Sequence, residues 1–106
     1  MSNPRVEILY FDGCPNWQET EKLVERIASE LGIDPTIQLF EVPDGEAAIE
    51  HRFLGSPTVR VDGADVEPGG EARRDFVFAC RVYRTGSGFS GQPDEAWIRA
   101  ALGSNR

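Results

Sequence analysis

The two cysteines, Cys14 and Cys80, are the side chains of this chain best suited to covalent chemistry. Cys14 follows an apolar run, residues 6–11, and stands at the start of an amphipathic segment headed by Pro15. The first turn of a helix carries unsatisfied N–H groups and a partial positive charge, which stabilise a thiolate and lower the pKa of a cysteine. Cys14 is therefore a candidate nucleophile.

The composition limits the partners and metal sites that are available to such a thiol. The chain has 106 residues, which suits one domain, and a formal net charge of −7. Residues 1–53 hold 11 acidic and 4 basic residues, a balance that disfavours nucleic acid or an anionic membrane as a partner. Two cysteines and one histidine are too few for a disulfide-stapled scaffold or a closed structural zinc site, so we expect no metal and no cofactor.

The first residues and the apolar runs of the chain predict the cellular compartment of the protein. The first residues, MSNPRVEILYF, show no cationic stretch followed by a long apolar region. No run approaches the length needed to cross a bilayer. We therefore expect a cytoplasmic protein whose cysteines are thiols at rest.

The first half of the chain has the pattern of a strand, a helix and a second strand. Residues 5–11 read as a strand covered on both faces, and residues 36–42 as a shorter one. Between them, residues 15–31 carry an apolar helical stripe that ends at Gly32. Two strands joined in this way are expected to be parallel.

The second half is predicted to add a short helix, two strands and a last helix. The short helix opens at residues 43–45 and stops near Gly55, and a strand over 58–62 follows, headed by Pro57. Asp62 and Gly63 would normally make a tight hairpin turn, but a polar stretch follows, and we expect residues 64–75 to be a mobile insertion. The remaining segments are a strand over 76–84, a glycine-rich loop over 86–91, a helix over 93–102 and a frayed tail over 103–106.

Two motifs in this order resemble the thioredoxin-like fold. FDGCPNW lies at the position of the active-site turn, and GSPTVRVDG is similar to the strand segment that begins with a cis-proline in thioredoxins and disulfide oxidoreductases. Together with CRVYRT, they resemble small bacterial thioredoxin-like proteins, some of which carry the label of the alkylmercury lyases. The resemblance implies one α/β domain over residues 1–106, ordered β-α-β-α-β-β-α, with a four-stranded mixed sheet flanked by three helices.

The resemblance also implies a substrate site beside Cys14. The Ser56–Pro57 bond would be cis, and the main chain of Ser56 would face the active cysteine. An incoming peptide or thiol would then pair with Ser56 as an added strand. Trp17 could stack on that substrate, although packing with partial exposure is the more common role of such an aromatic. Arg84 could bind a carboxylate or stabilise a thiolate, or could be a solvated charge on an edge strand.

The motif departs from that of thioredoxins at its fourth position, where Trp17 replaces a second cysteine. Without a neighbouring thiol, dithiol exchange cannot be completed inside the motif. Three interpretations remain open. Cys14 acts as a monothiol that forms mixed disulfides with glutathione or a protein thiol, or Cys80 resolves it, or Cys14 is a small turn residue in a redox-silent binding module.

Metal chemistry is an alternative of another class. Two thiolates suit a soft ion such as Hg(II) or Cu(I), and Asp12 beside them could supply the proton that cleavage of an organomercurial requires. Asp12 could equally serve only to form the turn before Gly13, and we favour that role.

Distance weighs against any pairing of the cysteines. A fourth strand over 76–84 would reach the site at its end, near Arg84, and leave Cys80 about 13 Å away at ~3.3 Å per residue. A disulfide needs α-carbons within about 7 Å. We expect Cys80 to be a buried strand residue, while the insertion before it leaves another register open. The primary prediction is thiol–disulfide exchange or mixed-disulfide formation by Cys14.

Overall fold

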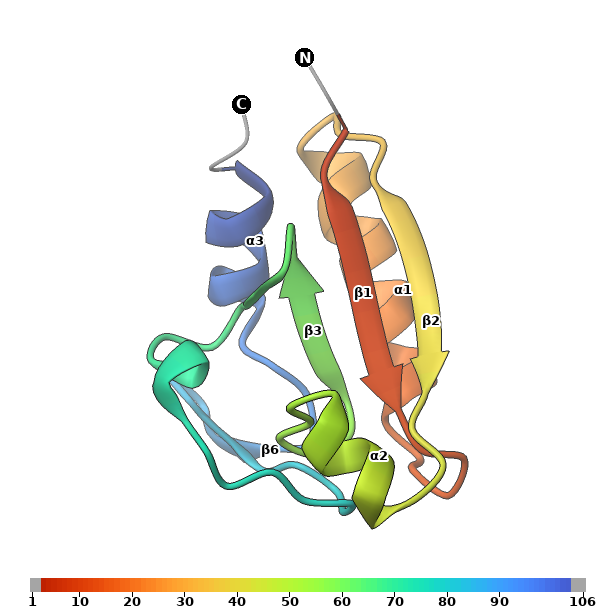
Figure 1. Ribbon diagram of the computed structural model, residues 1–106. Coiled ribbons are helices and arrows are strands. Elements are labelled where there is room, and N and C mark those ends of the chain that lie inside the picture. The colour runs from red at the N-terminus through yellow and green to blue at the C-terminus, as the bar shows by residue number, and fades with distance from the viewer. Residues whose placement is uncertain (1–2, 104–106) are drawn as a thin grey trace.

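The computed structural model describes residues 3–103 as a mixed α/β fold (Figure 1). Its elements, in chain order, are β1 (Arg5–Tyr10), α1 (Trp17–Glu30), β2 (Thr36–Glu41), α2 (Gly45–Glu50), β3 (Thr58–Val61), β4 (Ala64–Asp65), the 3-10 turn η1 (Gly70–Ala72), β5 (Tyr83–Thr85), β6 (Gly88–Ser90) and α3 (Glu95–Gly103). Gly103 ends α3, and the rest of the predicted frayed tail lies outside the described residues. Among residues 3–103, no helix combines the length and apolar character that crossing a bilayer requires.

The four-stranded sheet has the order β2-β1-β3-β4. β1 and β2 are parallel with α1 between them, so the predicted strand–helix–strand unit is confirmed. β3 runs antiparallel to β1, and β4 runs antiparallel to β3. The predicted class, a four-stranded mixed sheet with three helices, is therefore confirmed.

Alternation along β1 divides the core into two parts. Val6 and Ile8 are fully buried in one cluster that also contains the buried apolar residues of α1 and α3. Leu9 points to the opposite face, as period-two alternation requires, and packs with Phe53 in a second cluster near α2. Figure 1 shows α1 behind β1 and β2, with α2 near the carboxyl end of β1. The end of β1 that leads to Cys14 is thus held from both faces.

The fourth strand of the sheet is not the one predicted. Asp62 and Gly63 make a tight turn although a polar stretch follows them, with φ of 51° and 89°. That turn pairs Val61 with Ala64 and lets β4 take the free edge of β3. Both turn residues have the positive φ that a two-residue hairpin turn needs. The conformational preference of these two residues therefore determines which strand pairs with the free edge of β3.

The predicted strand over 76–84 is wrong in its extent and its partner. Residues 73–82 form no regular element apart from one bridge, and only Tyr83–Thr85 is a strand, paired with β6 in a separate hairpin. The expected glycine-rich loop supplies that hairpin's turn, at residues 86–87. The bridge joins Cys80 to Ser56 in parallel, which sets the geometry of the site.

Candidate functional site

Cys14 closes a tight turn at the end of β1. Its N–H donates to the carbonyl of Phe11 at 3.0 Å, and Asp12 and Gly13 are the exposed residues between them. Asp12 therefore occupies the turn position favoured from the sequence. The turn directs the chain into α1, which begins three residues after Cys14.

The Cys14 thiol is enclosed between this turn and the main chain of Ser56. Its side chain is buried, with 4% of the residue exposed. The Asn16 N–H donates to Cys14 Sγ at 3.4 Å, and Sγ lies 3.6 Å from the carbonyl oxygen of Ser56, to which the thiol can donate. An N–H at the start of a helix stabilises negative charge on a sulfur that accepts it.

The main-chain N–H and C=O groups of Ser56 both form hydrogen bonds within the protein. Its N–H donates to the carbonyl of Ala79 at 2.8 Å, and its own carbonyl accepts the N–H of Arg81 at 2.9 Å. The Ser56–Pro57 bond is cis, and Ser56 is buried. The resemblance implied that an incoming substrate would pair with Ser56. In the structure the segment around Cys80 already occupies that place.

Cys80 lies beside Cys14. It is the bridge partner of Ser56, whose carbonyl also contacts Cys14 Sγ. Desolvation by burial raises the pKa of the Cys80 thiol, and the nearby Cys14 side chain raises it further. The expected separation of about 13 Å is therefore wrong, because Cys80 belongs to the segment alongside Ser56 and not to a strand that ends near Arg84. Cys80 is also exposed, not buried as expected.

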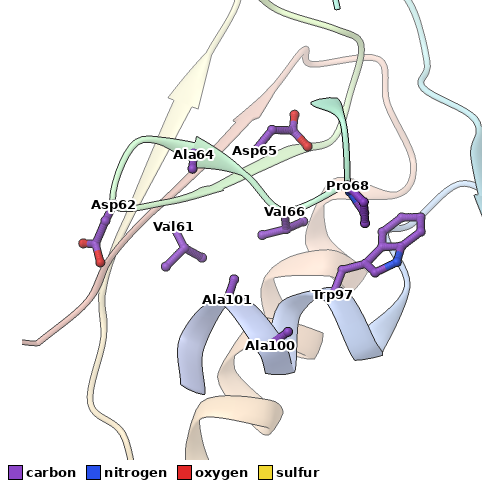
Figure 2. Close-up of a pocket in the computed structure, with 9 residues that line it drawn as sticks. All are labelled: Val61, Asp62, Ala64, Asp65, Val66, Pro68, Trp97, Ala100 and Ala101. Carbon is purple, nitrogen blue, oxygen red and sulfur yellow. The ribbon is translucent and has the colours of Figure 1, made fainter. Parts of the chain in front are cut away.

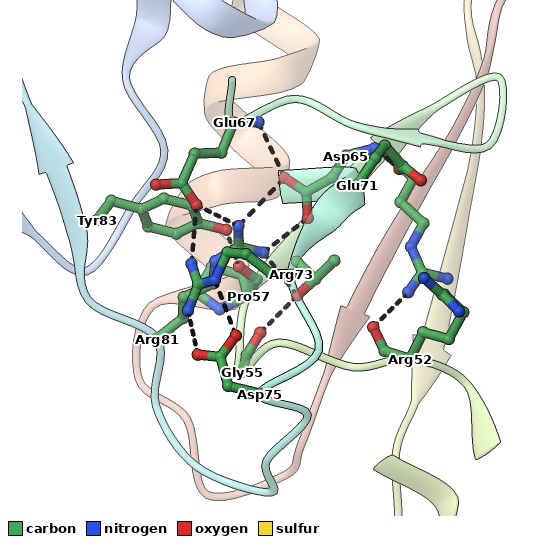
Figure 3. Close-up of polar contacts among 12 residues, drawn as sticks. Arg52, Gly55, Pro57, Asp65, Glu67, Glu71, Arg73, Asp75, Arg81 and Tyr83 are labelled. Carbon is green, nitrogen blue, oxygen red and sulfur yellow. Dashed lines mark hydrogen bonds and ion pairs between the residues drawn. The ribbon is translucent and has the colours of Figure 1, made fainter. Parts of the chain in front are cut away.

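Arg81 anchors this segment in a buried ion cluster (Figure 3). Only 1% of its side chain is exposed, and its guanidinium bonds Asp65 Oδ2 at 2.8 Å and Glu67 Oε1 at 2.6 Å. Burial disfavours the charged guanidinium, but Tyr83 and Asp65, together with Glu67, more than offset it, so the pKa of Arg81 is raised. Arg81 stays charged, and its position fixes that of Cys80.

The cluster is tied directly to the segment that bears Pro57. Arg81 lies over the ring of Tyr83, 4.4 Å from the ring centroid, and the Tyr83 hydroxyl donates to the carbonyl of Pro57. Burial raises the pKa of that hydroxyl, so it remains a donor. Gly55 has a φ of 115°, and a Cβ there would lie 2.9 Å from Arg81 Cβ. Only glycine lets the two segments approach this closely.

The other predicted site residues are placed differently. Trp17 is half-buried and stacks on Tyr10, with ring centroids 4.2 Å apart. Arg84 is exposed on β5, and its guanidinium lies 5.9 Å from the ring centroid of Phe89. The packing role favoured for Trp17 agrees with this placement.

Arg81 is the residue that sequence reasoning missed. From Cys80 to Arg84, exposed and buried residues alternate, which puts Arg81 and Tyr83 on the inner side. Asp65 and Glu67 in the preceding polar stretch were the available signal for an acidic partner.

A surface hollow of about 470 Å³ has neither Cys14 nor Cys80 in its lining (Figure 2). It is lined by Val61, Asp62, Ala64, Asp65, Val66, Pro68, Trp97, Ala100 and Ala101. Figure 2 shows Trp97 at one end of the hollow and Asp62 at the other. Asp65 connects this hollow to the Arg81 cluster.

Within residues 3–103, no group of three or more potential metal-ligating side chains comes together. The site is thus two neighbouring cysteines, one buried and one exposed, that both adjoin the main chain of Ser56. A scan against protein-family models and a search of curated proteins found no match to this chain.

Proposed function

We propose that the protein carries out thiol–disulfide exchange through Cys14 and Cys80 as a pair. The observation that carries this proposal is that Ser56 joins the two cysteines: its carbonyl lies 3.6 Å from Cys14 Sγ, and it pairs with Cys80 in a parallel bridge. Two neighbouring thiols supply both sulfurs that dithiol exchange needs, although the motif around Cys14 holds only one cysteine. The thioredoxin-like relationship and the cytoplasmic location expected from the sequence belong to the same proposal.

The two cysteines differ in exposure, and this difference assigns each sulfur a separate step. Cys80 is exposed and Cys14 is buried, so the mixed disulfide with a substrate forms on Cys80. The Cys80 thiolate attacks one sulfur of a substrate disulfide, and the other sulfur leaves as a thiolate that takes up a proton. Cys14, as a thiolate, then attacks Cys80 Sγ, forms the Cys14–Cys80 bond and releases the second substrate thiolate. Two electrons pass from the pair to the substrate.

The reverse reaction uses the same atoms. An external thiolate attacks the exposed Cys80 Sγ of the oxidised pair, and Cys14 leaves as a thiolate. The Asn16 N–H that points at Cys14 Sγ is in place to stabilise that leaving group. A second external thiolate then attacks the substrate sulfur, releases Cys80 and completes oxidation of two thiols to one disulfide.

Glutathione disulfide serves as a probe of this order of steps. The reduced protein is expected to form a glutathione adduct on Cys80 and then lose it as the internal disulfide forms. Cys14→Ser is expected to stop at the Cys80 adduct, which mass spectrometry detects. A stable adduct on Cys14 in the unmutated protein, with Cys80 unmodified, would support the monothiol interpretation. Unreacted thiols at both positions would support a redox-silent binding module.

The same pair of sulfurs favours a second candidate function, the binding of one soft metal ion. Two thiolates suit Hg(II) or Cu(I), which accept two-coordinate sulfur sites. One equivalent of Hg(II) per chain is expected to bind, and either single cysteine-to-serine variant should lose most of the affinity. Equal affinity of both variants and the unmutated protein would contradict this candidate.

A further inference from the structure

The outer edge of the segment from Cys80 to Val82 is open. On the inner edge, the Ala79 carbonyl and the Arg81 N–H are both bonded to Ser56. Neighbouring residues of an extended chain direct their main-chain groups to opposite edges. Within residues 3–103, the N–H and C=O groups of Cys80 and Val82 bond no partner. Unpaired groups of this kind are a template for another strand.

The side chains along this edge are also exposed in a regular pattern. Cys80, Val82 and Arg84 are exposed, whereas Arg81 and Tyr83 between them are buried. Val82 is 66% exposed, and Phe89, opposite Arg84 in the hairpin, is 78% exposed. These two are the most exposed large apolar side chains among the described residues. An apolar surface therefore begins beside the exposed thiol.

Charge adds a second preference at the same place. Arg84 is exposed and, within residues 3–103, forms no ion pair. It lies four residues from Cys80 on the same exposed side, about 13 Å away in an extended chain. Residues 54–106 hold 7 acidic and 7 basic residues, so the net charge of −7 comes from the first half of the chain and does not oppose an acidic group beside Arg84. Arg84 favours an acidic group on whatever lies along the edge.

We propose that the substrate of the Cys80 thiol is an extended polypeptide segment that pairs with the outer edge of residues 80–82. The inference rests on the proposed exchange at Cys80 and names its substrate class. Residues two apart share one face of a strand. A cysteine opposite Cys80 therefore places the residue two positions away against Val82 and the residue four positions away near Arg84. The matching pattern is a cysteine, then an apolar residue, then an acidic residue at alternate positions, in either direction.

Main-chain pairing gives a signature that side-chain contacts cannot. The probe is the nonapeptide acetyl-Glu-Thr-Val-Thr-Cys-Thr-Val-Thr-Glu-amide, which fits both strand directions. Its cysteine is activated as a mixed disulfide with thiopyridine, so attack by Cys80 releases a chromophore. Two further peptides carry N-methyl groups, one on the Val and Cys residues and the other on the Thr residues. Only one of these two sets of N–H groups can face the outer edge of residues 80–82.

One methylated peptide is expected to react with the reduced protein at the rate of the unmodified peptide. The other should react roughly tenfold more slowly, the loss expected for about two main-chain hydrogen bonds. Equal rates for the two methylated peptides would overturn the proposal. Arg84→Gln should remove a roughly two- to fivefold preference for this peptide over one with Gln in place of Glu. Reaction with 2,2′-dithiodipyridine, which has no main chain, reports Cys80 reactivity alone, so failure of the exchange chemistry is distinguishable from failure of strand pairing.

Discussion

Cys80 pairs with Ser56 in a parallel bridge, and the Ser56 carbonyl that accepts the Arg81 N–H also lies 3.6 Å from Cys14 Sγ. One buried serine thus aligns the two segments that carry the thiols. The bond pattern gives the exposed cysteine a fixed position and makes it the neighbour of the buried one. Predictions about reactivity follow from this alignment and from what anchors it.

Alkylation of Cys80 should depend on pH in a way that burial sets first and Cys14 modifies. Because the pKa of Cys80 is raised, first by burial and then by Cys14, the reactive thiolate is scarce near neutral pH. The rate with iodoacetamide should therefore keep rising with pH beyond about 8.5, the value of a free thiol. Cys14→Ser removes the neighbouring charge, so the midpoint should fall. Peptide mapping assigns the modified residue, and a midpoint unchanged by Cys14→Ser would contradict an effect of Cys14 on the Cys80 thiol.

Loss of Arg81 should release the Cys80 segment. Arg81→Leu leaves the buried Asp65 carboxylate without its partner, and breaking one half of a buried pair costs about 3–5 kcal/mol. Urea unfolding measures the change. Arg73→Leu is the matched control, because its pairs with Glu67 and Asp75 are more exposed and should contribute about 0–1 kcal/mol. Similar losses for the two variants would show that the Arg81 cluster does not anchor the fold.

A milder variant keeps this prediction testable where Arg81→Leu does not fold. Arg81→Lys retains the charge but not the planar fork that bonds two carboxylates and Thr58. It should fold, with a lower yield of the Cys14–Cys80 disulfide under mild oxidation. An unchanged yield would mean that Arg81 plays no part in positioning Cys80.

A side chain at Gly55 should separate the two segments that meet at the site. In Gly55→Ala, the new Cβ would lie 3.1 Å from Arg81 Cα as well as close to Arg81 Cβ, and the φ of 115° is strained for alanine. The backbone strain costs about 1–3 kcal/mol, and overpacking adds about 1–3 kcal/mol. Gly32→Ala is the control, because its φ of 69° is also positive while nothing lies within 4 Å. Thermal unfolding should show the larger loss for Gly55→Ala, and equal losses would argue against the close contact.

The parts of the fold that follow from local pattern were predictable from the sequence. The stripe of Val24, Ile27 and Ala28 becomes the buried face of α1, and period-two alternation in β1 separates Ile8 from Leu9. Asp44 caps α2 by accepting the Ala47 N–H. Each of these depends on residues a few positions apart, which a sequence pattern contains.

The site itself depended on choices between distant segments. Asp62 and Gly63 favour a tight turn, whereas the polar stretch after them favours a loop, and the turn that forms gives the free edge of β3 to β4. The segment before β5 then lies along Phe53–Ser56 instead, through the Val77 N–H and the Ser56 bonds. A buried arginine with two carboxylate partners from an earlier stretch holds it there. Strand periodicity within 76–84 does not identify the segment that this strand meets, so the sequence pattern does not determine the distance between the cysteines.

Formation of the Cys14–Cys80 disulfide is the most direct test of a paired-thiol site. The full-length protein is oxidised mildly with glutathione disulfide, its remaining thiols are alkylated, and it is then unfolded and digested with trypsin. We predict one linked species that joins the peptides of residues 6–22 and 75–81, which hold Cys14 and Cys80 respectively. It should disappear on reduction and be absent from both single cysteine-to-serine variants. Stable, unlinked glutathione adducts on either cysteine, or two unmodified thiols, would contradict the account.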